Sequence, residues 1–179
     1  AKLIGSRQRG LITYVMSLMN GARIGIAAQA LGIGEAAYRV ARDYAHSRKQ
    51  FGNAIENFPA VRELLVNMRL DVYAARALTY YSAWCVDIEH GALRKLEGDI
   101  EDADEKKRVR AESKKFGRYN KMLTPMSKYY ASEMSIRVTN DAMSVLGGRG
   151  YMKDYPVAPH LPNARITTTN EGPSQLEGL

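Results

Sequence analysis

Apolar residues recur at three- and four-residue spacing along most of the chain, which is the period of an amphipathic α-helix. The first segment with this pattern runs from Leu11 to about Ser47. It is rich in small residues, which let a neighbouring helix or a flat ligand approach its backbone closely. These small residues are Gly25, Ala27, Ala28, Ala30, Gly32, Gly34, Ala36 and Ala37. The pattern therefore predicts a long first helix that packs at short distance.

A break follows this segment, because Gly52 and Pro59 both oppose a continuous helix. We expect a second helix with Asn57 near its N-cap and Pro59 in its first turn, where a missing N–H costs little. Its apolar stripe consists of Val61, Leu64, Leu65, Met68, Val72, Ala75 and Leu78.

Residues 93–122 are dense in charges of both signs and poor in large apolar side chains. Such a run is either an exposed helical extension or a mobile connection, and we interpret it as a charged insertion without a catalytic role. Helical order is expected to resume at Thr124 and Pro125, a capping residue followed by proline. The stripe that follows ends at the segment GGRGY, residues 147–151, for which a helix C-cap is the default interpretation.

These segments predict an all-α fold, an up-down helical bundle of three long amphipathic helices with shorter pieces. The 179 residues are expected to form a single domain. The chain has no initiator methionine, and its opening KLIG reads as the last residues of a preceding strand. We therefore expect a C-terminal fragment of a longer protein.

Composition narrows the class of protein. No apolar run approaches the length of a membrane span, and no signal peptide is evident. The single cysteine, Cys85, excludes an internal disulfide framework and fits a reducing compartment, so we expect the cytoplasm, or the mitochondrial matrix in a eukaryote. The formal net charge of +7 leaves three partners or roles open: nucleic acid, the phosphates of a nucleotide cofactor or coenzyme A, or a solvated helical surface.

Few residues offer chemistry on their own. His46, His90 and His160 are far apart in the sequence, and none has a second histidine or a cysteine at helical spacing. Cys85 lies in the apolar segment YYSAWCVDI, where a buried, inert thiol is expected. Glu171, in the segment TTTNEGP, would by itself be a loop carboxylate.

Three segments taken in order change this picture: NGARIGIAAQALGIGEAAYRVARDYAHSRKQFG, SKYYASEMSIRVTNDAMSVLGGRGYMKDYPV and ARITTTNEGPSQLE. Together they resemble the C-terminal helical domain of the acyl-CoA dehydrogenase family, over nearly the whole chain except residues 93–122. The resemblance implies an FAD-dependent enzyme that dehydrogenates the Cα–Cβ bond of an acyl-CoA thioester. It also implies that electrons pass to an electron-transfer flavoprotein or a similar acceptor, and that this fragment alone is inactive.

In this resemblance Glu171 matches the carboxylate that removes the α proton while a hydride leaves Cβ for flavin N5. Arg23 matches the arginine that orients the base, and Ala22 occupies the position where other members carry the base. Gly172 would let the backbone pass close to the ligand. A base of this kind benefits from a dry, apolar pocket, because its affinity for a proton rises there.

Two further segments, SRKQFG and LGGRG, resemble the family's FAD-binding segments. Arg48 would bind the pyrophosphate, because a bidentate guanidinium suits phosphate oxygens. Since the SRKQFG contact crosses a subunit interface in the family, the resemblance implies a homodimer or a homotetramer. The matched cofactor-binding positions are Arg48, Gln50 and Phe51 near the pyrophosphate and nucleotide, Ser144, Gly147 and Gly148 towards the flavin and the adenosine end, and Gly172 beside the base.

Four positions of this chain depart from the family's pattern. Here Ser144 stands in place of a glutamine, Pro162 in place of an arginine, Asn170 in place of an aromatic residue and Pro173 in place of a threonine. A proline at position 173 has neither a backbone N–H nor a hydroxyl to offer the flavin. Two alternatives therefore stay open beside the dehydrogenase. One is an oxidase-like relative in which O₂ reoxidises the flavin, and the other is a non-catalytic relative that binds acyl-CoA or nucleic acid.

Overall fold

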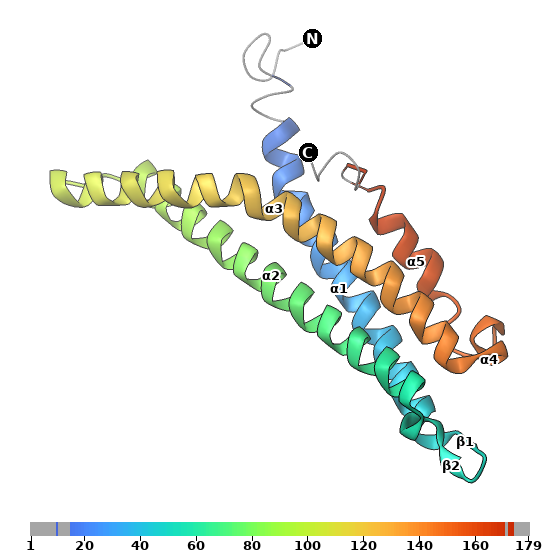
Figure 1. The fold of residues 1–179 in the computed structure, drawn as a ribbon. Helices are drawn as coiled ribbons and strands as arrows, with labels where there is room; N and C mark the ends of the chain where they lie inside the picture. Colours follow the sequence, from blue (N-terminus) through green and yellow to red (C-terminus); the bar gives the residue numbers. More distant parts are fainter. Residues whose placement is uncertain (1–9, 11–14, 171, 174–179) are drawn as a thin grey trace.

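The computed structural model describes residue 10, residues 15–170 and residues 172–173. Over this range the chain forms three long α-helices, two short ones and a small β-hairpin (Figure 1). The three long helices run up, down and up again, which confirms the predicted all-α up-down bundle. None of the described helices is long and apolar enough to cross a membrane. The helices are α1 (Met16–Ser47), α2 (Pro59–Glu97), α3 (Ala103–Leu146), α4 (Gly148–Tyr151) and α5 (His160–Thr167).

A tight hairpin joins α1 to α2. Its strands β1 (Lys49–Gln50) and β2 (Asn53–Ala54) are antiparallel. The two turn residues have positive φ, 48° at Phe51 and 82° at Gly52, as the twist of a two-residue hairpin favours. A short 3-10 helix, η2 (Ile55–Asn57), then leads into α2. The register pairs Lys49 with Ala54 and Gln50 with Asn53.

Small residues on α1 bring α1 and α3 close together, as the sequence predicts. At Gly34 an added Cβ would lie only 2.8 Å from the Met134 sulfur of α3. The core continues with Val72 of α2 and Val138 of α3, both buried. This face of α1 therefore has no room for bulky side chains. Its fully buried positions are Ala27, Ala30, Ala37, Ala41 and Ala45.

Two helix starts differ from the prediction. Phe58, not Asn57, is the N-cap residue of α2, and its side chain makes no capping hydrogen bond within the described chain. Pro59 is the first helical residue, as expected. The third long helix begins at Ala103 rather than near Thr124, and the Asp102 side chain caps it by accepting a hydrogen bond from the backbone N–H two residues later, at 2.9 Å.

Thr124 and Pro125 lie inside α3, so the expected helix start there is wrong. The Thr124 hydroxyl donates to the Asn120 carbonyl at 2.7 Å instead of capping a helix. Pro125 has no N–H to donate, and α3 changes direction along its length (Figure 1). The charged segment before Thr124 is rich in Ala, Glu, Lys and Arg, all good helix formers. The helix therefore forms upstream of the local capping signal.

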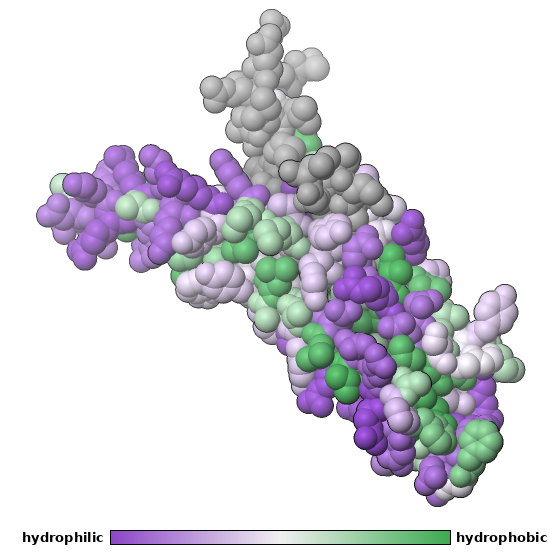
Figure 2. All heavy atoms as spheres, viewed as in Figure 1, coloured by the Kyte–Doolittle hydropathy of each residue, from purple (hydrophilic) through white to green (hydrophobic). Residues whose placement is uncertain are grey.

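The end of α2 and the start of α3 form a helical hairpin over residues 93–122, hereafter the α2–α3 hairpin. It projects beyond the bundle, and its surface is mostly hydrophilic (Figure 1, Figure 2). Towards the bundle, Cys85, Phe116 and Leu123 form a small second core. The charged segment is therefore a helical extension, and its status as an insertion stays a prediction.

Candidate functional site: a groove beside β1 and a buried lysine at Gly172

The end of α1, the β-hairpin and the end of α3 enclose a groove of about 520 Å³, which we name the β1–α3 groove. The end of α3 is far in the sequence from α1 and the hairpin, and the bundle brings all three to one end. Five of the seven cofactor positions expected from the resemblance therefore share one groove, and Phe51 and Gly172 lie outside it. The five are Arg48, Gln50, Ser144, Gly147 and Gly148.

Arg48 stands where α1 ends, and hydrogen bonds fix its backbone on both sides. Its N–H donates to the Tyr44 carbonyl at 2.8 Å, and its carbonyl accepts from the Ile55 N–H at 2.9 Å. The backbone here is extended, with φ −77° and ψ 126°, so the chain turns directly from the helix into β1. A rigid backbone thus holds the half-buried Arg48 side chain against the groove.

The glycines after α3 serve two purposes. Gly147 has a φ of 60° and caps α3 through its N–H, which donates to the Ser144 carbonyl at 3.1 Å, so the predicted C-cap is confirmed. A Cβ added at Gly147 or Gly148 would meet nothing within 4 Å, whereas one at Gly150 would lie 2.5 Å from the Met143 carbonyl oxygen. The first two glycines therefore keep the groove open, and Gly150 lets α4 pack against α3.

Arg149 adds a second guanidinium to the groove. It lies over two aromatic rings, 5.9 Å from the centroid of Tyr44 and 5.7 Å from that of Tyr155. The two rings meet edge to face at 6.5 Å and together form an aromatic surface on which the Arg149 guanidinium packs. Sequence reasoning missed both Arg149 and Tyr44, although Arg149 lies within the GGRGY motif. Their contact depends on a fold that places the end of α1 beside α4.

Phe51 is not among the residues that line the groove. Its side chain is 93% exposed at the turn of the hairpin, and its ring meets Phe58 edge to face at 6.3 Å. A single chain therefore leaves this predicted cofactor residue pointing into solvent.

The segment after α5 approaches α3 at Lys128. Lys128 is fully buried, and its ammonium donates a hydrogen bond to the Gly172 carbonyl. Gly172 has a φ of 111°, a conformation that other residues rarely adopt. Glu171, the expected base, lies outside the described residues, so the structure gives only the position of its neighbour. Sequence reasoning missed Lys128, because a lysine in a helix is normally a surface charge.

The threonine run before Gly172 ends α5. Each of the three hydroxyls donates to a carbonyl three residues back, at 2.7 Å for Thr167, 2.8 Å for Thr168 and 2.9 Å for Thr169. Thr167 is also buried, with its oxygen 3.4 Å from the Ser135 oxygen of α3. These bonds satisfy the last turn of the helix and lead the chain towards Lys128.

Arg23 is half-buried near the start of α1. An α-helix rises 1.5 Å per residue, so Arg23 is separated from Arg48 by about 37 Å along the axis. The start of α1 and the end of α5 both lie at the end of the bundle away from the β-hairpin (Figure 1). One chain therefore does not bring Arg23 and Gly172 together with the β1–α3 groove.

Other candidate chemistry is weak. Cys85 is buried, as predicted, and burial raises the pKa of its thiol, which disfavours the reactive thiolate. Burial likewise lowers the pKa of His160 at the start of α5, so its imidazole tends to stay neutral. In the described part of the chain, no three His, Cys, Asp or Glu side chains come together as a metal site.

Comparisons with known proteins agree with this architecture. A sequence model of the acyl-CoA dehydrogenase C-terminal domain matches residues 9–178. A 3-(aryl)acrylate reductase of Clostridium sporogenes is 34% identical over 177 residues, which cover 99% of this chain and 39% of that protein. A short-chain specific acyl-CoA dehydrogenase of Megasphaera elsdenii is 33% identical over 175 residues, covering 98% of this chain and 38% of that protein.

Solved structures show the same fold. The structure of butyryl-CoA dehydrogenase from Megasphaera elsdenii aligns with a TM-score of 0.74 at 32% identity, over 97% of this chain and 38% of that one. The chain thus spans about 39% of the length of the relatives it matches. Its sequence match and its fold together establish that the chain belongs to the acyl-CoA dehydrogenase family, in the region of the C-terminal domain.

Proposed function

We propose that this chain is the C-terminal part of an enzyme that dehydrogenates the Cα–Cβ bond of an acyl-CoA thioester, with FAD as the hydride acceptor. The observation that carries the proposal is the β1–α3 groove, where two guanidinium groups and two open glycines meet. Membership of the family supplies the reaction class. The enzyme would act in its full length, since the chain covers only part of its relatives.

The groove fits the phosphates of FAD. Arg48 and Arg149 line it, and its described lining includes no carboxylate that would repel an anion. The open space at Gly147 and Gly148 lets a cofactor reach the backbone, where any side chain would stand in its way. When bound, FAD supplies an acceptor for the hydride that leaves Cβ.

The residues near Gly172 would do the proton chemistry. We assign Glu171 as the base that takes the α proton of the thioester. Lys128 acts as a positioning residue, because its ammonium holds the Gly172 carbonyl directly after the base. Arg23 is assigned to orient the carboxylate, and its neighbour Ala22 cannot take a proton.

The site would be completed across a subunit interface. The β1–α3 groove and the Gly172 segment lie at opposite ends of one bundle (Figure 1). A flavin bound at the groove of one chain would therefore meet the base of another chain. We propose a homodimer or a homotetramer for this reason.

The direction of the reaction would depend on the electron partner. The Clostridium sporogenes relative is named as a reductase, and a base that removes a proton in one direction returns it in the other. We propose an electron-transfer flavoprotein or a similar acceptor for the dehydrogenase direction. With a low-potential donor instead, the same residues would reduce an enoyl or aryl-acryloyl substrate.

The visible spectrum of the full-length protein under anaerobic conditions tests this function. A panel of saturated acyl-CoA thioesters is added to the oxidised protein, and the corresponding enoyl-CoA thioesters are added to the reduced protein. We expect one thioester to bleach the flavin band, Glu171→Gln to abolish the bleaching, and Glu112→Gln, on the exposed hairpin, to leave it unchanged. A protein that binds no flavin, or a flavin that no thioester bleaches, would overturn the proposal.

A further inference from the structure

A second groove, of about 690 Å³, lies between α1 and α2 and shares no lining residue with the β1–α3 groove. From α1 it is lined by Glu35, Tyr38, Arg39 and Arg42. From α2 it is lined by Arg69, Val72, Tyr73 and Arg76. We name it the arginine groove.

The two helices supply these residues at identical spacing, i, i+3, i+4 and i+7, so each helix turns one continuous stripe towards the groove. Positions that face a neighbouring helix at this spacing are ordinarily apolar. Val72 is the one aliphatic side chain of the described lining, and it is buried at the core. Four of the other positions are arginines instead.

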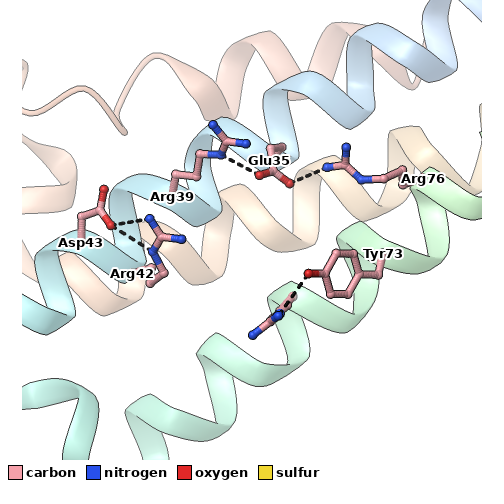
Figure 3. A network of polar contacts seen from close by, with 7 residues as sticks. Glu35, Arg39, Arg42, Asp43, Tyr73 and Arg76 are labelled. Carbon is pink, nitrogen blue, oxygen red and sulfur yellow. Dashed lines mark hydrogen bonds and ion pairs between the residues drawn. The ribbon is translucent and has the colours of Figure 1, made fainter.

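Glu35 ties the two helices together and fixes two of these arginines. Its carboxylate accepts from Arg39 Nε at 2.6 Å and, across the groove, from Arg76 Nη2 at 2.7 Å (Figure 3). A guanidinium carries five N–H groups, so these bonds leave most of the donors of both arginines for a ligand. Arg76 Nε is buried without a hydrogen-bond partner in the described part of the chain. The network therefore holds these guanidinium groups in place without exhausting their donors.

The other two arginines are held at their own helices. Arg42 donates to Asp43 Oδ1 from Nε at 2.9 Å and from Nη2 at 2.8 Å. Arg69 donates to the Tyr73 hydroxyl at 3.1 Å and lies 5.2 Å from the centroid of that ring. Figure 3 shows the Arg42 pair and the Glu35 network along the same face of α1.

The groove carries an excess of positive charge. Its lining has four guanidinium groups and one carboxylate, Glu35, with Asp43 beside it as a second partner. Like charges that share a groove repel one another, and a bound anion relieves that repulsion. The side chains of Arg39 and Arg42 are 65% and 53% exposed, so an anion can reach them from solvent.

We propose that the arginine groove binds the phosphates of an oligophosphate anion. A planar guanidinium binds phosphate oxygens through paired N–H donors, and arginines on both walls match an anion with two or more adjacent phosphates. The Tyr38 and Tyr73 side chains add aromatic walls and hydroxyl groups. This site goes beyond the proposed function, whose FAD and acyl thioester belong to the β1–α3 groove and the Gly172 segment.

Pyrophosphate is the probe that tests this site. Isothermal titration of the full-length protein, saturated with FAD so that the β1–α3 groove is filled, measures its affinity at low and at moderate salt. We expect binding that weakens as salt rises and that falls about tenfold or more in the double variant Arg39→Gln, Arg69→Gln. The double variant Arg62→Gln, Arg94→Gln removes the same charge from exposed α2 positions outside the groove, and it should bind within about twofold of the unchanged protein.

Parallel titrations with ADP distinguish free oligophosphate from a nucleotide. Tighter binding of ADP than of pyrophosphate would show that a base contributes beside the phosphates, and equal affinity would show that the groove reads the phosphates alone. Either result supports the site, provided that the variant Arg39→Gln, Arg69→Gln loses affinity. Absence of binding at millimolar pyrophosphate, or equal loss in both double variants, overturns it. The proposal would also be overturned if a second copy of the chain covers the groove. In that case the protein would bind no pyrophosphate, and the groove variant would have an altered oligomeric mass.

Discussion

Lys128 places a positive charge inside the packing surface of α3, where its side chain is fully buried. Burying an ammonium is costly unless hydrogen bonds replace the lost water. The Gly172 carbonyl accepts one such bond, which suits a group that positions the chain around it. The sequence alone could not predict this role, because nothing in SKYY marks the lysine as buried. The place of Gly147 and Gly148 at the end of α3, by contrast, could be predicted, because they belong to the glycine-rich segment GGRGY.

We expect Lys128→Met to slow reduction of the flavin by acyl-CoA about tenfold or more, with KM changed less than about twofold. Methionine keeps the apolar stem of the side chain but donates no hydrogen bond, so the Gly172 segment loses its anchor. Stopped-flow absorbance measures the rate. Lys121→Met, an exposed lysine on the same helix, is the matched control. Equal rates in the two variants would contradict the positioning role.

Gly148 and Gly150 form a matched pair within α4. A Cβ added at Gly150 would lie 2.5 Å from the Met143 carbonyl oxygen, and one at Gly148 would meet nothing within 4 Å. We expect Gly150→Ala to lower the free energy of unfolding by about 1–3 kcal/mol, because the backbone must shift. Gly148→Ala should keep its Tm but bind FAD more weakly, since the methyl enters the groove. Calorimetry and flavin titration measure the two effects, and normal FAD affinity in Gly148→Ala would remove this residue from the cofactor site.

Asp141 on α3 offers a test by pH. The pKa of its carboxyl is raised above the usual 3.8, chiefly by burial and in smaller part by the negative charge of Asp71. A hydrogen bond with Asn140 and the positive charge of Arg137 lower the pKa, but they do not cancel the rise. The folded protein thus holds this proton more tightly than the unfolded chain, so stability is lost as pH rises from 3.8 through the raised pKa.

We therefore expect Asp141→Asn to stabilise the protein at about pH 7 by less than about 1 kcal/mol, because the side chain is partly exposed. The gain should vanish below the unperturbed pKa of 3.8, where both states are protonated. Urea unfolding at the two pH values measures the difference. A variant less stable than the unchanged protein at neutral pH would contradict this sign.

At the scale of elements, an apolar stripe predicts a helix that buries this stripe against the core, and it predicts little else. The end of α1 at Ser47 and the start of α2 at Pro59 agree with the sequence pattern, because one face of each helix lies against the core, whereas α2 continues to Glu97, well past the last predicted stripe residue, Leu78. The start of α3 was missed, since a hairpin that buries few residues leaves no stripe. There the helix propensity of a charged segment and its pairing with α2 decide the structure. The local signal at Thr124 and Pro125 was weaker than both.

Val109 tests whether the α2–α3 hairpin folds independently of the bundle. It is only 6% exposed, so Val109→Asp would bury an unpaired carboxylate. We expect hydrogen exchange to accelerate in the hairpin while peptides that contain Met68 and Val138 stay protected. Ala111→Asp adds the same charge at an exposed position and should leave exchange unchanged. Faster exchange throughout the core would show that hairpin and bundle unfold as one unit.

At the scale of the whole molecule, the arrangement of the sites follows from antiparallel packing of long helices. Motifs far apart in the sequence meet at the β1–α3 groove, whereas the start of α1, which carries Arg23, and the segment after α5, which contacts Lys128 through Gly172, lie towards the opposite end. The resemblance to the family could predict five members of the β1–α3 groove, because they lie in recognisable motifs, but it missed Tyr44 and Arg149. It could not predict the arginine groove, since eight residues at ordinary helical spacing become a site only when α1 lies beside α2.

The separation of the two ends predicts complementation between two inactive variants. Arg48→Gln impairs the groove and Glu171→Gln removes the base, so each alone should lack activity. In a mixed dimer, one site would combine the intact base of the first chain with the intact groove of the second. Random pairing makes half of the dimers mixed, so about a quarter of all sites should be restored on co-expression. Acyl-CoA-dependent flavin reduction measures this fraction. Activity no higher than that of the separate variants would mean that groove and base act within one chain, with the remainder of the protein bridging the length of the bundle.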